Sequence, residues 1–210
     1  MSNAPEHGND NGNELPALDF HSPGRFAIHN PPAEGGEPAV RPEPAPFILG
    51  QHEPKEAASS PEQLRSHALA LIDQARRSLC LYTPDLEAWL YDHRAIGDAC
   101  SRFLRAHPRN RLRILLRDSS LAVRNGHRLL RLARQLPSNC QIRKLHPDYP
   151  AADLAYLLAD DCGLLLRAAP QLPAAQVHYQ ARARVRQLQH QFDQAWNTSL
   201  SDPDLRSFLL

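Results

Sequence analysis

The fold is decided by residues 153–167, which read DLAYLLADDCGLLLR. Two short apolar runs, residues 154–160 and 163–167, flank a polar turn that starts at Asp160 and Asp161. Apolar runs of this length, bounded by Asp and Gly, are typical of buried strands, and so short a connection joins antiparallel neighbours. The stretch therefore predicts a buried β-hairpin.

Outward from the hairpin, the sequence alternates helical and strand patterns. Ser60, Pro61 and Gln63 supply an N-cap, a proline for the first helical position and a capping-box residue, which together predict the start of a helix. Apolar periodicity then predicts helix 61–77, strand 78–83, helix 93–106, strand 112–116, helix 121–136, strand 140–145, the hairpin, and a helix through 181–195. This order predicts a layered α/β fold, with a mixed sheet flanked by helices on both faces.

Composition and charge divide the chain near residue 60. Residues 1–60 hold more than half of the 19 prolines, six of the nine glycines, and nine acidic against three basic residues. A segment of this kind buries too little apolar surface to offset the entropy of ordering it. We therefore predict a disordered, acidic Pro/Gly-rich arm over residues 1–55 and one α/β domain over residues 60–210.

The apolar island Phe47-Ile48-Leu49 interrupts that arm and leaves two interpretations open. It docks on the domain as a strap or edge strand, or it is a short apolar segment in a flexible linker.

The cysteines and the apolar runs exclude several classes of protein. Cys80, Cys100, Cys140 and Cys162 form no C-x-x-C pair and adjoin no histidine cluster, so we expect buried thiols, no metal site and no cofactor. The apolar runs are far shorter than the roughly 20 residues of a membrane-spanning helix. The first thirty residues lack the basic start and apolar stretch of a secretory signal. We expect a cytoplasmic protein without a membrane span.

From Pro61 to Ser199, the order of elements resembles a single repeat of the phospholipase D superfamily. Four stretches carry the resemblance: residues 75–82, 111–116, 153–167 and 192–199. In that superfamily the first strand of the hairpin carries H-x-K-x4-D, in which the histidine attacks phosphorus and the lysine neutralises phosphate. Here the motif positions are Asp153, Ala155 and Asp160, so only the last residue of the motif is kept. The resemblance implies the fold and argues against the chemistry, as in a pseudoenzyme.

Three residues are weak candidates for surviving catalysis. A carboxylate at Asp153 could attack phosphorus, but without the lysine it would repel an anionic phosphodiester. Asp160 is either part of a site or simply a turn residue. His178 precedes several arginines and is either a replacement catalytic group or a residue at the entry to a helix. We assign no catalytic residue.

Ligand-binding candidates follow the first strand, at the sheet edge where open α/β sheets place their ligands. They are Asp85, Glu87, Trp89 and Tyr91, joined by Arg117 at the end of the second strand, by Arg167 at the end of the hairpin and by Arg182 after it. Acidic groups beside aromatic rings suit recognition. In the alternative interpretation, Trp89 and Leu90 plug the core, the carboxylates cap the next helix, and Arg117 pairs internally.

Arginine dominates the positive charge of residues 61–210, which hold 20 Arg and one Lys. Guanidinium groups bind phosphates in bidentate fashion, which favours phosphate-containing ligands, although the same residues also suit a solvated face. We expect a non-catalytic phospholipase D-like domain that binds an anionic ligand, a nucleic acid or a protein partner. The alternatives are a phosphodiesterase or phosphotransferase with substituted catalytic residues, and a structural interaction module. Because the superfamily builds one active centre from two motif copies, the resemblance also implies a homodimer.

Overall fold

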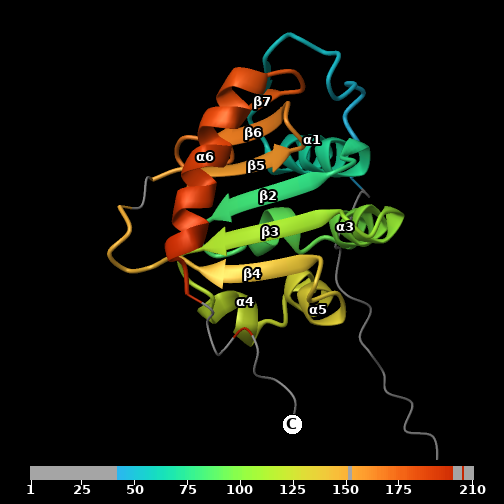
Figure 1. The fold of residues 1–210 in the computed structure, drawn as a ribbon. Helices are drawn as coiled ribbons and strands as arrows, with labels where there is room; N and C mark the ends of the chain where they lie inside the picture. The colour runs from blue at the N-terminus through green and yellow to red at the C-terminus, as the bar shows by residue number, and fades with distance from the viewer. Residues whose placement is uncertain (1–41, 151–152, 201–204, 206–210) are drawn as a thin grey trace, which may run out of the picture. The chain divides into compact units, whose positions relative to one another are not determined.

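The computed structural model describes residues 42–150, 153–200 and 205, which form a seven-stranded mixed sheet with helices on both faces (Figure 1). The strand order is β1-β7-β6-β5-β2-β3-β4. The strands are β1 (Glu56–Ala58), β2 (Ser78–Thr83), β3 (Arg111–Leu116), β4 (Cys140–Lys144), β5 (Ala155–Ala159), β6 (Gly163–Arg167) and β7 (Ala175–His178). The predicted α/β class with a mixed sheet flanked by helices is confirmed.

The predicted hairpin lies inside the sheet. β5 pairs antiparallel with β6, with Ala159 opposite Gly163, and antiparallel with β2, with Leu81 opposite Leu157. β2, β3 and β4 are parallel to one another. All five residues of β5 are buried, because helices cover both of its faces. The continuous apolar run in the sequence reflects this double burial.

Two hydrophobic clusters occupy the two faces of the sheet. The helices are α1 (Pro61–Gln74), α2 (Ala88–Tyr91), α3 (Arg94–Ala106), α4 (Ser120–Arg124), α5 (Arg128–Gln135) and α6 (Arg182–Thr198). One cluster joins α1, α3 and α5 to strand residues such as Leu81 and Ile114, and the other joins α6 to residues such as Cys80 and Leu115. In Figure 1, α6 crosses one face of the sheet alone. Cys80 and Leu115 are 1% and 0% exposed, so α6 closes this face of the core.

The predicted helix over residues 121–136 is two helices, α4 and α5. Asn125, Gly126 and His127 separate them, and Gly126 has a φ of 63°. A left-handed residue ends a helix, and glycine adopts that conformation without steric cost. The strands β1 and β7 and the short helix α2 were not predicted, because each is too short to show a period.

The predicted arm, residues 1–55, has to be shortened at its C-terminal end. Residues 1–41 lie outside the described part of the chain, whereas residues 43–52, here named the strap, pack against α1 and the end of β7. The backbone N–H of Ala45 donates to the carbonyl of Ser66 (3.1 Å), and that of Gly50 donates to the carbonyl of Tyr179 (2.8 Å). The ring of Phe47 lies 4.4, 5.7 and 5.4 Å from the rings of His52, His67 and Tyr179. Of the two interpretations of Phe47-Ile48-Leu49, the docked strap is the one observed.

All four cysteines are buried free thiols. Burial raises the pKa of Cys140 to about 12, so this thiol stays protonated at neutral pH. Among the described helices, none combines the length and the hydropathy that crossing a bilayer requires.

Candidate functional site

Two motif positions carry carboxylates, Asp153 in place of the histidine and Asp160 as the aspartate that is kept, and they lie at opposite ends of β5. Asp153 precedes the strand and Asp160 follows it, and an extended chain of that length spans roughly 20 Å. His178 lies opposite Leu164 in the β6–β7 pairing, so it is near the Asp160 end of the sheet. The structure therefore does not bring Asp153, Asp160 and His178 together in one cleft.

Asp160 anchors the start of β2. Its carboxylate accepts the backbone N–H groups of Arg76 (2.9 Å), Arg77 (2.8 Å) and Ser78 (3.0 Å). Its own backbone has a φ of 55°, a left-handed conformation that aspartate tolerates better than most residues. Asp160 is thus a turn residue, and its carboxylate fixes the backbone of Arg76 and Arg77, which follow the end of α1.

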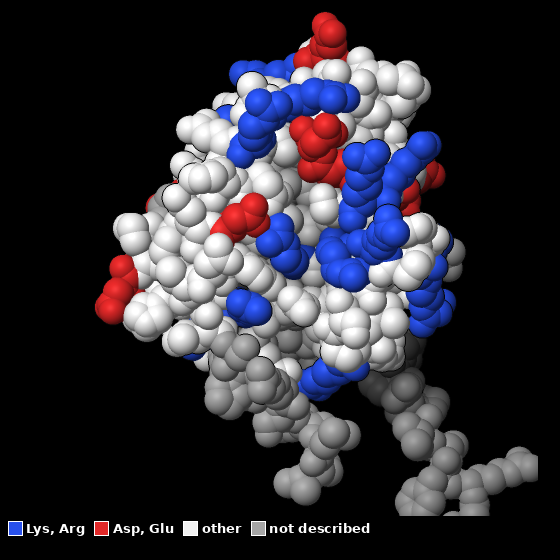
Figure 2. Space-filling view, viewed as in Figure 1, with Lys and Arg blue, Asp and Glu red and all other residues white. Residues whose placement is uncertain are grey.

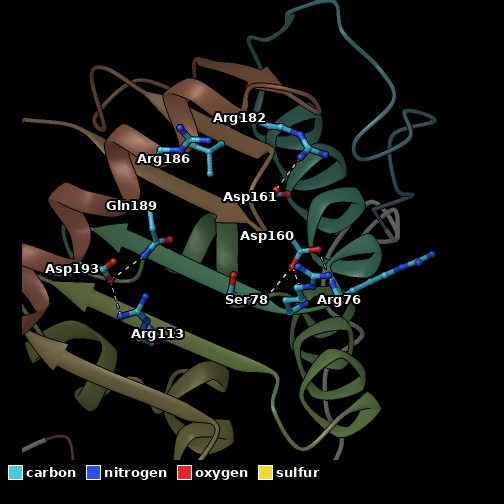
Figure 3. Close-up of a pocket in the computed structure, with 11 residues that line it drawn as sticks. Arg76, Ser78, Arg113, Asp160, Asp161, Arg182, Arg186, Gln189 and Asp193 are labelled. Carbon is cyan, nitrogen blue, oxygen red and sulfur yellow. Dashed lines mark hydrogen bonds and ion pairs between the residues drawn. The ribbon is translucent and has the colours of Figure 1, made fainter.

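An arginine-lined cleft of about 750 Å³ opens between this turn, the starts of β2 and β3, and α6. Its charged residues are Arg76, Arg77, Arg113, Arg182, Arg186, Asp160, Asp161 and Asp193. Figure 2 shows basic side chains gathered on this face, with acidic side chains between them. Figure 3 shows Arg76 on the α1–β2 side of the cleft and Arg182 on the α6 side. Three elements far apart in sequence thus contribute guanidinium groups to one hollow.

The carboxylates of the cleft are already engaged. Asp161 pairs with Arg182 (3.2 Å), and Asp193 pairs with Arg113 (2.8 Å), whose guanidinium also lies 5.2 Å from the centroid of the Phe192 ring. Asp160 is held by the three backbone donors. Within the described residues, the side chains of Arg76, Arg77 and Arg186 have no ion pair or hydrogen bond, and all three are exposed. Five guanidinium groups against three carboxylates give the cleft a net charge of +2, and three of its arginine side chains form no ion pair within the described residues.

A second hollow of about 760 Å³ lies at the other end of β5. Asp85, Glu87, Trp89 and Asp153 contribute to its lining, so the structure does bring four of the predicted residues together. Leu86 and Glu87 have φ values of 73° and 40° after β2, which turns the chain sharply into α2. Arg117 approaches Asp153, with 3.8 Å between the guanidinium and the carboxylate.

Most charge in this second hollow is neutralised internally. Glu87 (4% exposed) and Arg167 (1% exposed) form a buried ion pair, and Thr83 Oγ1 donates to Glu87 (3.0 Å). Arg167 also donates to the carbonyls of Pro170 and Leu172, and its guanidinium lies 4.8 Å from the centroid of the Trp89 ring.

Of the predicted ligand-binding residues in this segment, Asp85 and Trp89 stay accessible and Tyr91 does not. Burial, helped by the charge of Asp118, raises the pKa of Asp85, whose carboxylate accepts the backbone N–H of Glu87 (2.9 Å). Tyr91 is 2% exposed inside the core, so it cannot contact a ligand in the hollow. Leu90 is the buried plug of the alternative interpretation, whereas Trp89 is 38% exposed.

The sequence interpretation placed Arg182 among the candidates but missed Arg76, Arg77, Arg113 and Arg186. Two local signals could have found three of them: an arginine pair directly before a strand, and arginines at i and i+4 on one helix. Arg113 gives no such signal, because it alternates with apolar residues in β3 like any solvent-facing strand residue. Among the described residues, no cluster of three or more His, Cys, Asp or Glu side chains could hold a metal ion.

Comparison with known proteins gives a family and a fold. Residues 60–208 match the family described as "Domain of unknown function (DUF7931)". A search of the curated proteins finds no significant match.

The similar solved structures include TrmBL2, described as an archaeal chromatin protein with a novel mode of DNA binding. It has a TM-score of 0.54 and 14% identity over 72% of this chain and 56% of its own length. The phospholipase D family member Nuc from Salmonella typhimurium has a TM-score of 0.51 and 14% identity over 70% of this chain and 96% of its own. NucT from Helicobacter pylori has a TM-score of 0.51 and 9% identity, with coverage of 71% and 99%. The fold is phospholipase D-like.

Proposed function

Because the chain belongs to the DUF7931 family and has a phospholipase D-like fold, we propose that its domain is a non-catalytic module that binds the phosphate backbone of a nucleic acid. The bound backbone lies in the arginine-lined cleft beside α6. The homodimer and the cytoplasmic location stay predictions.

The three cleft arginines that form no ion pair within the described residues carry the proposal. Arg76, Arg77 and Arg186 line a common hollow, where Asp161 and Asp193 pair with other arginines and Asp160 accepts backbone N–H groups. Phosphate groups spaced along a nucleic acid can accept from several guanidinium groups at once and release their counterions on binding. The cleft thus favours a polyanion over a single small anion.

The lining of the cleft indicates contacts to the backbone and not to the bases. Among the described residues that line it, none is aromatic, and the nearby Phe192 and Trp196 are buried. Stacking platforms for unpaired bases need exposed rings. We therefore expect binding with little sequence preference.

The motif positions support a domain without catalysis. Asp153 and Ala155 replace the nucleophile and the phosphate clamp, and Asp153 lies at the opposite end of β5 from the cleft. A phosphodiester bound by the arginines is out of reach of that carboxylate. The DNA-binding TrmBL2 supports the proposal by analogy of fold alone.

The test is titration of a fluorescently labelled DNA duplex with the full chain, followed by anisotropy at several salt concentrations. We expect Arg76→Ala/Arg77→Ala/Arg186→Ala to weaken binding about tenfold or more and to flatten the slope of log K against log salt by about 0.9 per lost contact. The matched control is Arg105→Ala/Arg124→Ala/Arg131→Ala, which removes the same number of exposed arginines from α3, α4 and α5 on the other face. The control should bind like the wild type.

Two results would overturn the proposal. Equal loss of affinity in both sets of variants would mean that net charge, and not the cleft, drives binding. Turnover of a generic phosphodiester by the wild type, abolished in Asp153→Ala, would show an active enzyme with a substituted nucleophile.

A further inference from the structure

Leu49 of the strap packs against Gly163, beside the hairpin turn, where the chain has no side chain. A Cβ placed on Gly163 would come within 2.6 Å of Leu49 Cδ1, so Leu49 occupies space that only a glycine leaves open. Gly50 follows in a left-handed conformation (φ 81°) and donates to the carbonyl of Tyr179 (2.8 Å). The strap is therefore seated on the turn that carries Asp160 and Asp161.

The strap is also hydrogen-bonded to the end of α1. The Gln74 side chain accepts the backbone N–H of Leu49 (2.8 Å) and donates to the carbonyl of Phe47 (2.8 Å). Gln74 is the last residue of α1 and lies two positions before Arg76. One short segment thus holds the turn and the origin of the two arginines at once.

Asp160 closes these contacts into a ring. Its carboxylate binds the backbone N–H groups of Arg76 and Arg77, while Gly163, three residues on, contacts Leu49, and Leu49 binds Gln74. A closed ring of contacts fixes its members more tightly than a chain of contacts, because moving one member strains two neighbours. Asp161, on the same turn, holds Arg182 on the α6 side of the cleft (3.2 Å).

We infer that docking of the strap sets the geometry of the arginine-lined cleft, so that releasing the strap weakens the binding of a polyanion. The inference rests on the proposed function and identifies the strap as a segment that regulates the affinity of the same site. Within the described residues, no hydrogen bond or ion pair joins the strap to the side chain of a cleft arginine, so the strap acts by position. A free strap leaves the turn and the α1–β2 link to move independently, and Arg76, Arg77 and Arg182 lose their common orientation. Binding then has to restore that orientation at a cost in affinity.

The strap itself offers a matched pair of substitutions. Leu49 is seated against Gly163, whereas its neighbour Ile48 is 54% exposed. Leu49→Ala therefore frees the strap, and Ile48→Ala makes the same kind of change on its solvent side. Gln74→Ala removes the second attachment without altering the strap.

The experiment measures the affinity of the full chain for the labelled DNA duplex in the wild type and these three variants, with a thermal melt of each. We expect Leu49→Ala and Gln74→Ala to weaken binding about threefold to tenfold, as is usual for residues that couple two parts of a protein, and Ile48→Ala to leave it unchanged. If Leu49→Ala unfolds at the working temperature, Gln74→Ala decides. Wild-type-like binding by folded Leu49→Ala or Gln74→Ala overturns the coupling, whereas failure of the wild type to bind DNA overturns the proposed function instead.

Discussion

Glu87 and Arg167 carry opposite charges into the interior at the carboxyl end of β2. Burying a charge costs several kcal/mol, and only a partner with further hydrogen bonds offsets that cost. Thr83 supplies a hydroxyl to Glu87, and the carbonyls of Pro170 and Leu172 accept from Arg167. The pair ties the α2 turn to the end of β6, so it is a structural link across residues that are 80 positions apart.

At this scale we predict that Arg167→Met lowers the free energy of unfolding by about 3–5 kcal/mol, because it leaves Glu87 charged and buried without its partner. The double variant Glu87→Leu/Arg167→Met should lose clearly less than the two single variants together, since it removes both charges. Urea denaturation measures all four free energies. Additive losses would show that the two side chains do not act as a pair.

How far single residues can be predicted depends on whether their partner is local. The spacing of residues 153–167 predicts the hairpin and places Asp160 in its turn, because the residues that form a turn are adjacent in the sequence. The bonds from Asp160 to Arg76 and Arg77 join residues more than 80 positions apart, and nothing near either end of the sequence signals them. The candidate group Asp85, Glu87 and Trp89 is near a real hollow, but Arg167 neutralises Glu87 in a way that only the folded chain reveals.

Among the elements, the strap shows how a composition rule misplaces a boundary. Prolines and glycines around residues 42–54 indicate a linker, yet Phe47 and Leu49 find sites prepared by α1 and the hairpin turn. Two apolar side chains suffice to order a short segment when its backbone also gains partners, such as Ser66 and Gln74.

At the scale of elements we predict different outcomes for two truncations. Removal of residues 1–41 should leave Tm unchanged, because the whole strap is kept. Removal of residues 1–52 deletes Phe47 and Leu49 and should cost about 2–4 kcal/mol, with a drop in Tm of roughly 5–15 °C. Differential scanning calorimetry distinguishes the two. Equal Tm values for the two truncated chains would mean that the strap contributes nothing to stability.

In the described part of the molecule, charged side chains line two cavities, which lie at opposite ends of β5. The hollow at the Asp153 end, where the superfamily motif would act, holds neutralised charge, and the cleft at the Asp160 end has a net charge of +2. The order of elements in the sequence was enough to predict the sheet and its two helical layers. Which end carries the exposed charge depends on where α6 crosses the sheet, and periodicity does not determine that.

A prediction for the whole molecule concerns how its stability depends on pH. Burial lowers the pKa of His67, His127, His93 and His178 below the ordinary value of 6.5. The unfolded chain therefore takes up protons on these rings at a pH where the folded protein does not, and stability falls as pH drops through the unfolded value near 6.5. Urea denaturation should give a smaller free energy of unfolding at pH ~5.5 than at pH ~7.5.

His67 allows that effect to be assigned. Its ring is buried against Phe47 and shares a hydrogen bond with the Tyr179 hydroxyl (3.0 Å). His67→Gln keeps a polar group there but removes the titration, so stability should depend less steeply on pH. A free energy of unfolding that rises on acidification would contradict the sign of the prediction.

The two tryptophans of the chain lie near the two cavities, one beside each, and can serve as optical reporters. Trp89 is stacked by Arg167 at the hollow, and Trp196 lies 5.5 Å from the guanidinium of Arg113, which lines the cleft. Indole emission responds to nearby charge and solvent. Trp89→Phe would leave one indole that registers occupancy of the cleft, and Trp196→Phe would leave one that registers events at the hollow. Ligand entry into either cavity can thus be followed in the unlabelled protein, one cavity at a time.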